Sequence, residues 1–275
     1  MIYAPTFKKD YFMKLLTLDI RKDIFMTILL FSMCGMCFTQ DYEMVEDGIV
    51  RGAKDKKELA LILTGGSFAE GGDFILDTLK KYNVKASFFF TGDFFRIEEF
   101  KPIIKRIIKE GHYIGPHSDK HLLLADWEHR KNLVTEEVFK KDLEDNLKEL
   151  EKFGVKKKDV TFWIPPYEWY TKEHSQWSKE MGITLFNFTP GTRSNTDYME
   201  DDDPKYVPAD KILESIIKYE QENKDGLNGF LLLMHIGAGP GRTKDKFFYK
   251  LPDLLDYLSK KGYKLVKVDE LLKKK

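Results

Sequence analysis

Short apolar segments alternate with amphipathic segments along most of this chain, and the alternation restricts the folds open to it. Segments with the composition of buried strands cover residues 58–65, 85–92, 112–118, 159–167, 183–191 and 229–237, and a last strand begins at Tyr263. Stretches with helical spacing cover residues 73–84, 100–111, 135–154, 174–182, 209–223 and 247–262. Strands that alternate with helices form parallel sheets covered by helices. We therefore predict an α/β fold, and seven such units favour a barrel over an open sheet.

The N-terminal region reads as a targeting segment. Arg21 and Lys22 precede an apolar run at residues 24–38, which is shorter than the ~20 residues of a membrane span. A basic start followed by a short apolar run is typical of a secretory signal. We expect a signal peptide at 1–39, cleavage before Gln40, export to the periplasm or the extracellular space, and no membrane span in the mature chain.

Both cysteines, Cys34 and Cys37, lie inside this run, so the mature chain is expected to contain no disulfide. A lipid anchor on either cysteine is the alternative to cleavage. Residues 40–57 are interpreted as a linker, and residues 58–275 as one domain.

The charge balance argues against nucleic acid as a partner. Lys and Arg total 45, as do Asp and Glu, so the formal net charge is zero. A phosphate backbone favours a basic surface. The 21 Phe, 13 Tyr and 4 Trp residues suit either a large core or a surface on which sugar rings stack, and composition does not choose between them.

Polar residues gather where the predicted strands end. In α/β barrels the carboxyl ends of the strands form the face on which sites are built. The fold is therefore expected to bring together side chains that lie far apart in the sequence: Glu70, His117, His121, Tyr167, Glu168, Arg193 and His235.

His117 and His121 follow the third strand, four residues apart. Neutral imidazoles at this spacing can bind one cation, each through one ring nitrogen. The alternative is a pair of exposed or capping histidines. Asp119 between them is either a hydrogen-bond partner of the metal-binding histidines or solvated, and we favour the solvated position. His112, ahead of the turn, is interpreted as structural.

His235 ends the most apolar strand, in the sequence LLLMHIG. Such a histidine is either a core residue with satisfied hydrogen bonds or an acid–base group. Its position at the same rim as His117 and His121 favours the acid–base role.

The sequence IPPYEWY at 164–170 predicts a rigid loop, because adjacent prolines restrict the backbone. Such a loop can present the Tyr167 N–H to a developing oxyanion, or it can simply kink the end of a strand. Trp169 and Tyr170 either bind substrate by stacking on sugar rings or pack internally.

Four motifs, in this order, resemble those of the polysaccharide deacetylase family, also described as carbohydrate esterase family 4 or the NodB homology domain: ILDTLKKYNVKASFFFTG, IKEGHYIGPHSDKH, IPPYEWY and LLLMHIG. The resemblance runs from Leu59 to the C-terminus. It implies a distorted (β/α)7 barrel and an exported enzyme that hydrolyses N- or O-acetyl groups of a poly- or oligosaccharide.

The resemblance also implies roles. In the family an H-S/T-x-x-H pair and an Asp bind a divalent metal, commonly Zn²⁺, and His117 and His121 match the pair. A late L-x-H histidine is the general acid, which His235 matches, and Tyr167 matches the residue whose N–H stabilises the oxyanion. The metal would polarise the acetyl carbonyl and hold the attacking water.

This chain departs from the family pattern at the first motif, T-F-D-D-G. The aligned residues are 62–66, where Thr64 and Gly65 replace the two aspartates, so the base and a third metal ligand are missing. The arginine of the proline loop is absent. The sequence NFTPGTRSN at 187–195 replaces the family's Asp motif near strand five.

Other residues are candidates to compensate. Glu70, Asp73 or Glu168 can supply a relocated carboxylate, as base or as third ligand, and Arg193 can replace the missing arginine. The alternatives are helix N-terminal charges for Glu70 and Asp73 and a rim position for Glu168.

Three hypotheses follow. The chain is a divergent carbohydrate deacetylase, a family member that binds carbohydrate without catalysis, or a hydrolase that uses the same scaffold without metal. The sequence does not identify the glycan, the linkage of the acyl group or the oligomeric state.

Overall fold

The computed structural model of this protein describes residues 42–273. Its strands are β1 (Glu43–Val45), β2 (Gly48–Arg51), β3 (Glu58–Gly65), β4 (Ser87–Phe90), β5 (Tyr113–Pro116), β6 (Phe162–Trp163), β7 (Thr184–Leu185), β8 (Leu231–His235) and β9 (Lys264–Leu265). The predicted signal peptide at 1–39, with Cys34 and Cys37, lies outside the described residues.

Helices follow most of the strands. The α-helices are α2 (Gly72–Lys81), α3 (Gly92–Arg96), α4 (Lys101–Lys109), α5 (Glu136–Glu151), α6 (Lys172–Glu180), α7 (Ala209–Glu222), α8 (Leu251–Lys260) and α9 (Val268–Leu271). The Thr135 side chain accepts a hydrogen bond from the Val138 N–H and caps α5. In the part of the chain that the structure covers, no helix is long and apolar enough to cross a membrane.

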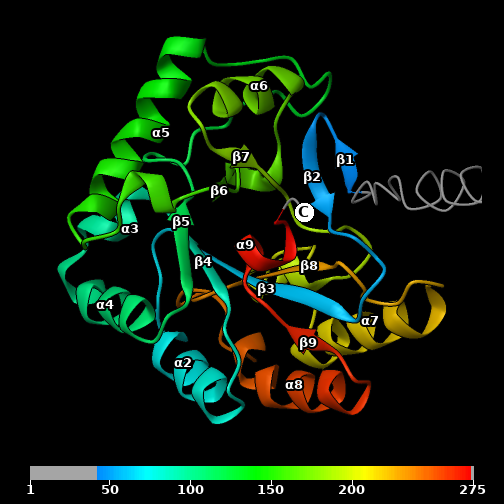
Figure 1. The fold of residues 1–275 in the computed structure, drawn as a ribbon. Coiled ribbons are helices and arrows are strands. Elements are labelled where there is room, and N and C mark those ends of the chain that lie inside the picture. The colour runs from blue at the N-terminus through cyan, green and yellow to red at the C-terminus, as the bar shows by residue number, and fades with distance from the viewer. Residues whose placement is uncertain (1–41, 274–275) are drawn as a thin grey trace, which may run out of the picture. The chain divides into compact units, whose positions relative to one another are not determined.

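The strands form a distorted parallel barrel. Strands β5, β4, β3 and β8 are neighbours in that order, β9 pairs with the start of β3, and β6 pairs with β7, all in parallel. Figure 1 shows helices α2, α4, α5, α6, α7 and α8 around these strands. The predicted α/β barrel is confirmed. It is distorted because several of its strands are only two residues long.

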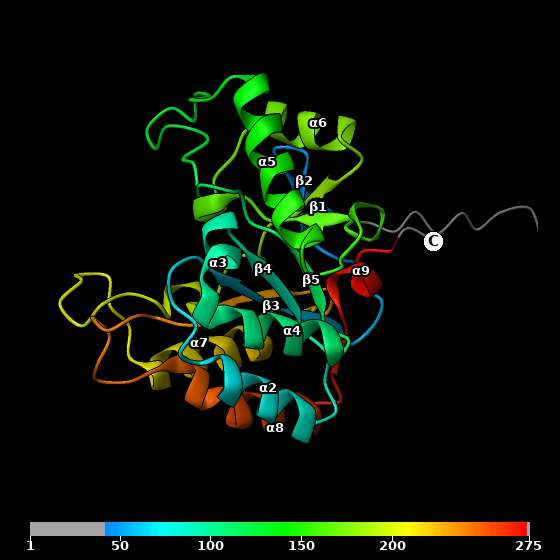
Figure 2. The same cartoon turned by 90° about the vertical axis from the view of Figure 1, so that its left-hand side faces the viewer.

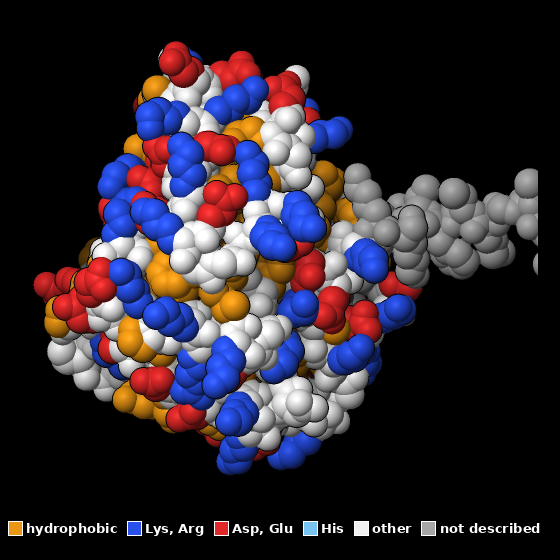
Figure 3. Space-filling model, turned by 60° about the vertical axis from the view of Figure 1, so that its left-hand side comes forward, with side chains coloured by type: hydrophobic (Ala, Val, Ile, Leu, Met, Phe, Trp, Pro, Cys, Tyr) orange, Lys and Arg blue, Asp and Glu red, His pale blue; other side chains and the backbone are white. Residues whose placement is uncertain are grey.

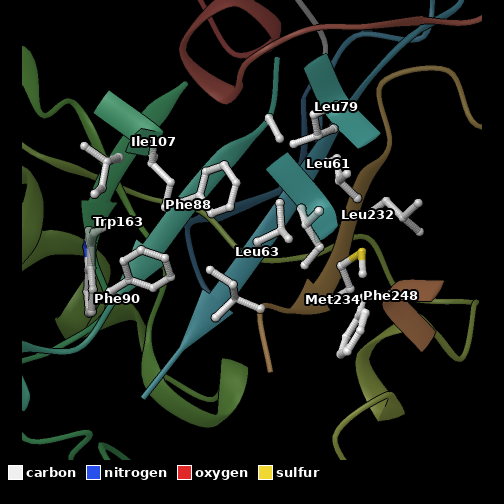
Figure 4. Close-up of a cluster of buried hydrophobic side chains, with 14 of the residues drawn as sticks. Leu61, Leu63, Leu79, Phe88, Phe90, Ile107, Trp163, Leu232, Met234 and Phe248 are labelled. Carbon is white, nitrogen blue, oxygen red and sulfur yellow. The ribbon is translucent and has the colours of Figure 1, made fainter. Parts of the chain in front are cut away.

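Alternate residues of the central strands face two separate apolar layers. Leu61 and Leu63 of β3 pack under the helices, as do Phe88 and Phe90 of β4 (Figure 4). The alternate residues of β3 and β4, together with Leu231 and Leu233 of β8, pack in the barrel interior: Ala60, Ile62 and Phe89. Burial on both faces explains why β3 and β8 read as continuous apolar runs.

The same alternation decides which side chains reach the end of the barrel. Thr64 continues the interior positions of β3, and His235 continues those of β8, directly opposite Thr64 in the register. Figure 2 shows the connections before α5 (green), before α7 (yellow) and after β8 (orange) projecting on one side. These connections surround the carboxyl ends of the strands.

Residues 43–51, interpreted from sequence as part of a linker, form the antiparallel hairpin β1–β2. Ile49 bridges to Phe186, the residue that follows β7, and the Gly52 N–H donates to the Gly229 carbonyl at 2.7 Å. Ile49 and Val50 are buried in the barrel unit. The linker interpretation is therefore corrected: the hairpin is an integral part of the barrel.

Charged side chains of both signs cover the surface. On the face shown in Figure 3, Lys and Arg side chains lie among Asp and Glu side chains. Many of them form exposed ion pairs, such as those of Lys140 with Glu136 and Glu180. Exposed pairs of this kind stabilise a fold by at most about 1 kcal/mol each.

Candidate active site

A pocket of about 670 Å³ opens at the carboxyl ends of the strands. This is within the range of ligand-binding pockets, roughly 300–1,000 Å³. Residues from several connections line it: Thr64, Gly65, Gly66, Ser67, Phe68, Thr91, Asp93, His117, His121, Tyr167, Glu168, Tyr198, Met199, Glu200, Asp202, Asp203, Pro204, His235, Gly237 and Ala238. Five of the sequence-predicted site residues are among them: His117, His121, Tyr167, Glu168 and His235.

His117 and His121 stand side by side in the pocket, with ring centroids 5.1 Å apart. The His117 Nδ1 lies 2.9 Å from the Ile164 carbonyl oxygen. A carbonyl only accepts, so Nδ1–H is the donor and Nε2 remains available to the pocket. His121 has a positive φ of 54°, which turns its ring beside that of His117.

Both imidazoles are neutral at neutral pH. Burial lowers the pKa of His117 well below its ordinary value, and the His121 charge lowers it further. Burial, followed by the His235 charge, lowers the pKa of His121 to about 4. Neutral imidazole is the form that binds a metal.

The pair lacks the partners of a catalytic zinc site. Thr64 and Gly65 end β3, where the family motif has aspartates, and Thr64 Oγ1 is buried without a hydrogen-bond partner. Across residues 42–273, no three His, Cys, Asp or Glu side chains converge as metal ligands. Catalytic zinc sites use three protein ligands. The described residues therefore do not fit such a site.

The residues between and before the two histidines are structural. Asp119, predicted to be solvated, is instead buried and accepts hydrogen bonds from Arg96 Nη1 at 2.7 Å and Nη2 at 3.1 Å. The prediction was wrong because the α3 helix brings Arg96 to this turn. His112 is structural, as predicted: it is buried, and its Nδ1 accepts from the Ala86 N–H at 3.1 Å.

His235 is held by Asp197, a residue that the sequence reading missed. Asp197 Oδ1 lies 2.6 Å from His235 Nδ1, and Oδ2 accepts from the His235 N–H at 2.8 Å. From the sequence, residues 187–195 were interpreted as replacing the family's Asp motif. Asp197 lies two positions beyond this segment and was therefore not considered. Burial lowers the pKa of His235, but Asp197 and Glu168 raise it more, so it lies above the ordinary value.

Glu168 lies in the same pocket. Burial raises the pKa of its carboxyl to about 7, the His235 charge acting against the shift and the Asp197 charge adding to it. A carboxylate that replaces the missing aspartates must lie in the pocket, and Glu168 does. At neutral pH the protonated and ionised forms of Glu168 are both populated, as a general base requires.

The proline loop turns sharply at Tyr167, whose φ is 57°. The next two N–H groups, of Glu168 and Trp169, donate to the carbonyls of Pro165 and Pro166. The Tyr167 N–H has no acceptor among the hydrogen bonds of this turn. This leaves it free to donate to a bound substrate, and its role toward an oxyanion stays a prediction.

Glu70 does not line the pocket that holds the histidines. Its Oε1 accepts from the Ala238 and Gly239 N–H groups, at 2.8 and 2.9 Å, and from Lys246 Nζ at 2.8 Å. Asp73 pairs with Arg106 at 3.0 Å. Both carboxylates are therefore engaged elsewhere, and the structure corrects their prediction as a base or third ligand.

The predicted substrate-binding residues separate into different environments. Tyr170 is fully buried and donates from its hydroxyl to the Val45 carbonyl at 2.8 Å, so it is a core residue. Arg193 is exposed beside α7, where its N–H donates to Ser215, and it does not line the pocket. Trp169 is half-buried, and its Nε1 donates to the Asp126 carbonyl at 3.0 Å.

Comparison with known proteins identifies the family. Residues 51–186 match the model of the family described as polysaccharide deacetylase. A peptidoglycan-N-acetylglucosamine deacetylase of Bacillus cereus is 30% identical over 219 residues, which cover 78% of this chain and 68% of the relative. The chain belongs to the polysaccharide deacetylase family. The resemblance read from the four motifs is thereby confirmed.

Solved structures of the polysaccharide deacetylase family share the fold. The peptidoglycan N-acetylglucosamine deacetylase Bc1960 is 26% identical with a TM-score of 0.65, over 82% of this chain and 92% of that one. BA3943 of Bacillus anthracis, described as a pseudoenzyme of carbohydrate esterase family 4, is 21% identical with a TM-score of 0.63, over 83% and 70%. The barrel of the polysaccharide deacetylase family, with seven strand–helix units, is thus the fold of this chain.

Proposed function

We propose that this chain is an exported hydrolase that removes N- or O-acetyl groups from a poly- or oligosaccharide. The observation that carries the proposal is the presence of His235 and Glu168 in one pocket, with the buried Asp197 holding the His235 ring from behind. The name of the Bacillus cereus relative makes the N-acetylglucosamine of peptidoglycan the first substrate to test. The basic start and apolar run at 24–38 support export.

Glu168 begins the proposed reaction as the general base. It accepts a proton from a water molecule whose oxygen attacks the acetyl carbonyl carbon, and the carbonyl electron pair moves to oxygen. The Tyr167 N–H, which has no acceptor in its own turn, would donate to this oxyanion. A carboxyl with a pKa of about 7 matches the task at neutral pH.

His235 completes the reaction as the general acid. When the intermediate collapses, the bond from the carbonyl carbon to the sugar nitrogen or oxygen breaks, and the leaving atom takes the proton of His235 Nε2. Asp197 holds Nδ1, which keeps Nε2 toward the pocket. The product leaves as acetic acid, which gives its remaining proton to water and becomes acetate, and a proton passing from Glu168 to His235 restores the starting state.

Acetate release from acetylated glucosamine oligomers, peptidoglycan and O-acetylated polysaccharide tests the proposal. We expect Glu168→Gln and His235→Ala each to lower kcat on the order of 100-fold or more. Glu70→Gln is the matched control, because Glu70 only joins two loops. A large loss in Glu70→Gln, with normal activity in Glu168→Gln, would overturn our assignment of the base.

A second candidate function is carbohydrate binding without catalysis. The observation in its favour is the pair Thr64 and Gly65 in place of the family's aspartates, and the solved structure of BA3943 is described as a pseudoenzyme. A wild-type protein that binds acetylated oligomers in calorimetry but releases no acetate from any of them would establish this function instead.

Binding of a divalent metal by His117 and His121, which the family pattern implies, needs its own test. Among divalent ions, Zn²⁺ is the one we propose to examine, because imidazole is among its preferred ligands. With two histidine donors available and a third protein ligand missing in residues 42–273, we expect less than one equivalent of zinc after dialysis against a chelator. One retained equivalent that disappears in the His117→Ala/His121→Ala variant would contradict this expectation.

A further inference from the structure

Trp127 is a large aromatic side chain beside the pocket for which the proposed reaction has no use. It is 59% exposed, although Trp side chains are usually buried over most of their surface. It belongs to the connection between β5 and α5, residues 117–135, which projects on the pocket side of the barrel (Figure 2).

The turn that carries Trp127 is held by its own hydrogen bonds. Asp126 accepts from the N–H groups of Glu128, His129 and Lys131 at 3.1, 2.7 and 2.5 Å. The Asp126 N–H donates to the Lys131 carbonyl at 2.9 Å. Side-chain acceptors of this kind fix a turn. Trp127 is therefore presented to solvent by an ordered turn.

The indole ring itself is oriented by stacking. Trp127 and Trp169 have ring centroids 5.8 Å apart and an interplanar angle of 26°. Arg130 lies 4.0 Å from the centre of the Trp169 ring and donates from Nε to the Tyr170 carbonyl at 2.8 Å. The stack and the cation–π contact leave a flat, pre-oriented aromatic surface on Trp127.

This surface is continuous with the pocket through Tyr167. The Tyr167 ring packs on His121, with centroids 4.5 Å apart, and meets the edge of Trp127 at 5.7 Å. Tyr167 is 46% exposed and lines the pocket. The aromatic contacts therefore run without a break from His121 in the pocket, through Tyr167, to Trp127.

We infer that Trp127, with Tyr167 beside it, is a stacking site for a second sugar ring of the polymer whose acetylated unit lies in the pocket. The inference rests on the proposed function and adds a substrate requirement. A β-linked pyranose with equatorial substituents presents flat C–H faces, which pack on an indole ring, while its hydroxyls stay in water. Continuity with the pocket favours this occupant over a protein partner.

Calorimetric titration with β-1,4-linked N-acetylglucosamine oligomers, from the monomer to the tetramer, tests the inference. The wild-type affinity should rise with length as the second ring reaches Trp127. Trp127→Ala should bind the tetramer on the order of tenfold more weakly, and the rise with length should disappear. Trp127→Tyr should recover most of the affinity, because it restores a flat ring.

Tyr249→Ala is the matched control. Tyr249 is as exposed as Trp127, at 59%, but does not line the pocket, and its removal should leave the length dependence unchanged. Thermal unfolding of each variant reports on the fold. Full length dependence in Trp127→Ala, or none in the wild type, would overturn the inference. Altered self-association of Trp127→Ala in sedimentation, without altered oligomer binding, would assign the surface to a second copy of the chain.

Acetate release, measured in parallel, separates this inference from the proposed function. Length-dependent binding without acetate would uphold the stacking site and refute the deacetylase. Acetate release with the same length preference in the wild type and Trp127→Ala would uphold the deacetylase and refute the stacking site.

Discussion

Glu168 links the chemistry of the pocket to the stability of the fold. Its carboxyl has a pKa of about 7, whereas the ordinary value, which it regains on unfolding, is 4.5. The folded chain therefore holds this proton more tightly than the unfolded chain. The resulting contribution to stability is complete below pH 4.5 and is lost as the pH rises through 7.

We predict that Glu168→Gln raises the free energy of unfolding at about pH 8 by roughly 2 kcal/mol, because Gln has no charge to bury. At about pH 4, where Glu168 is protonated in both states, the variant and the wild type should differ little. Denaturant unfolding at the two pH values measures the difference. A variant that is less stable than the wild type at the higher pH would contradict the raised pKa.

Asp197 and Glu168 together set the pH range over which His235 carries a proton. In the proposed reaction activity rises with pH as Glu168 ionises near pH 7, and it falls as His235, whose pKa Asp197 and Glu168 raise, is deprotonated. Asp197→Asn should lower kcat at least about tenfold, and it should move the alkaline limb to lower pH, because the carboxylate that raises the His235 pKa is gone.

The pH dependence of kcat checks this prediction. Asp201→Asn is a suitable control, since Asp201 lies on the same connection but accepts hydrogen bonds from Thr243 and Lys244. An unchanged alkaline limb in Asp197→Asn would show that His235 does not titrate in the profile.

Single residues were predictable where the end of a buried strand determined their direction. His235 is the last residue of β8 and His117 directly follows β5. Their location at the carboxyl ends of parallel strands could therefore be inferred from the sequence. Tyr170 could not, because the left-handed residues Tyr167 and Glu168 reverse the chain and turn the Tyr170 ring into the core. Arg193 was misplaced because the chain turns toward α7 after β7.

At the scale of one element, the end of β3 shows why the family's aspartates could not simply be restored at Thr64 and Gly65. Gly65 continues the series of Leu61 and Leu63, which face the helices. A Cβ at Gly65 would lie 2.7 Å from Ile236 Cγ2 and 3.0 Å from the Phe90 ring. The neighbouring side chains have closed over the place of the second aspartate.

We predict that Gly65→Asp destabilises the protein by about 1–3 kcal/mol, because the new side chain enters a packed apolar layer. Gly66→Asp is the matched control: its Cβ would meet Thr91 Cγ2 at 3.8 Å, an ordinary contact. Thermal unfolding of both variants gives the comparison, and equal melting temperatures would refute the packing argument.

Elements were predictable in proportion to their burial. β3 and β8 are buried on both faces and gave unbroken apolar runs, and α4 and α5 gave clear helical spacing. The β1–β2 hairpin was missed because β1 is three exposed residues long and β2 is four. Strands that short leave no period to detect.

At the scale of the whole molecule, the β1–β2 hairpin connects the start of the barrel to α7 and the turn before β8 through hydrogen bonds. Arg51 is buried and donates to the Asn228 carbonyl at 2.9 Å, the Gly226 carbonyl at 2.8 Å and the Tyr219 hydroxyl at 3.1 Å. These acceptors lie more than 160 positions later in the chain.

Arg51→Ala should lower the free energy of unfolding by about 2–4 kcal/mol, because it leaves buried carbonyl groups without hydrogen-bond donors and creates a cavity. Arg51→Lys should recover only part of the loss, because Lys cannot reproduce the guanidinium fork. Arg193→Ala, at an exposed arginine, is the control for loss of charge. A loss below about 0.5 kcal/mol in Arg51→Ala, typical of surface substitutions, would show that the hairpin is dispensable.

The barrel and its rim were predictable from sequence as a whole, because the order of strands and helices leaves few topologies. The third metal ligand and the base were not, since both depend on which loop carboxylate turns inward. Glu70 and Glu168 follow strands equally well, but only Glu168 enters the pocket. That choice is made by loop hydrogen bonds that no periodicity encodes.

The hairpin also has a kinetic consequence. The Gly226 and Asn228 carbonyls that accept from Arg51 lie 175 and 177 positions later in the chain. Until these residues are synthesised, the Arg51 side chain lacks these acceptors, although Ile49 can already pair with Phe186. Contacts so distant in sequence form slowly. Barrel closure should therefore be the last folding event, and during it the hairpin, the first described segment of the barrel to be synthesised, remains the one most open to proteases and chaperones.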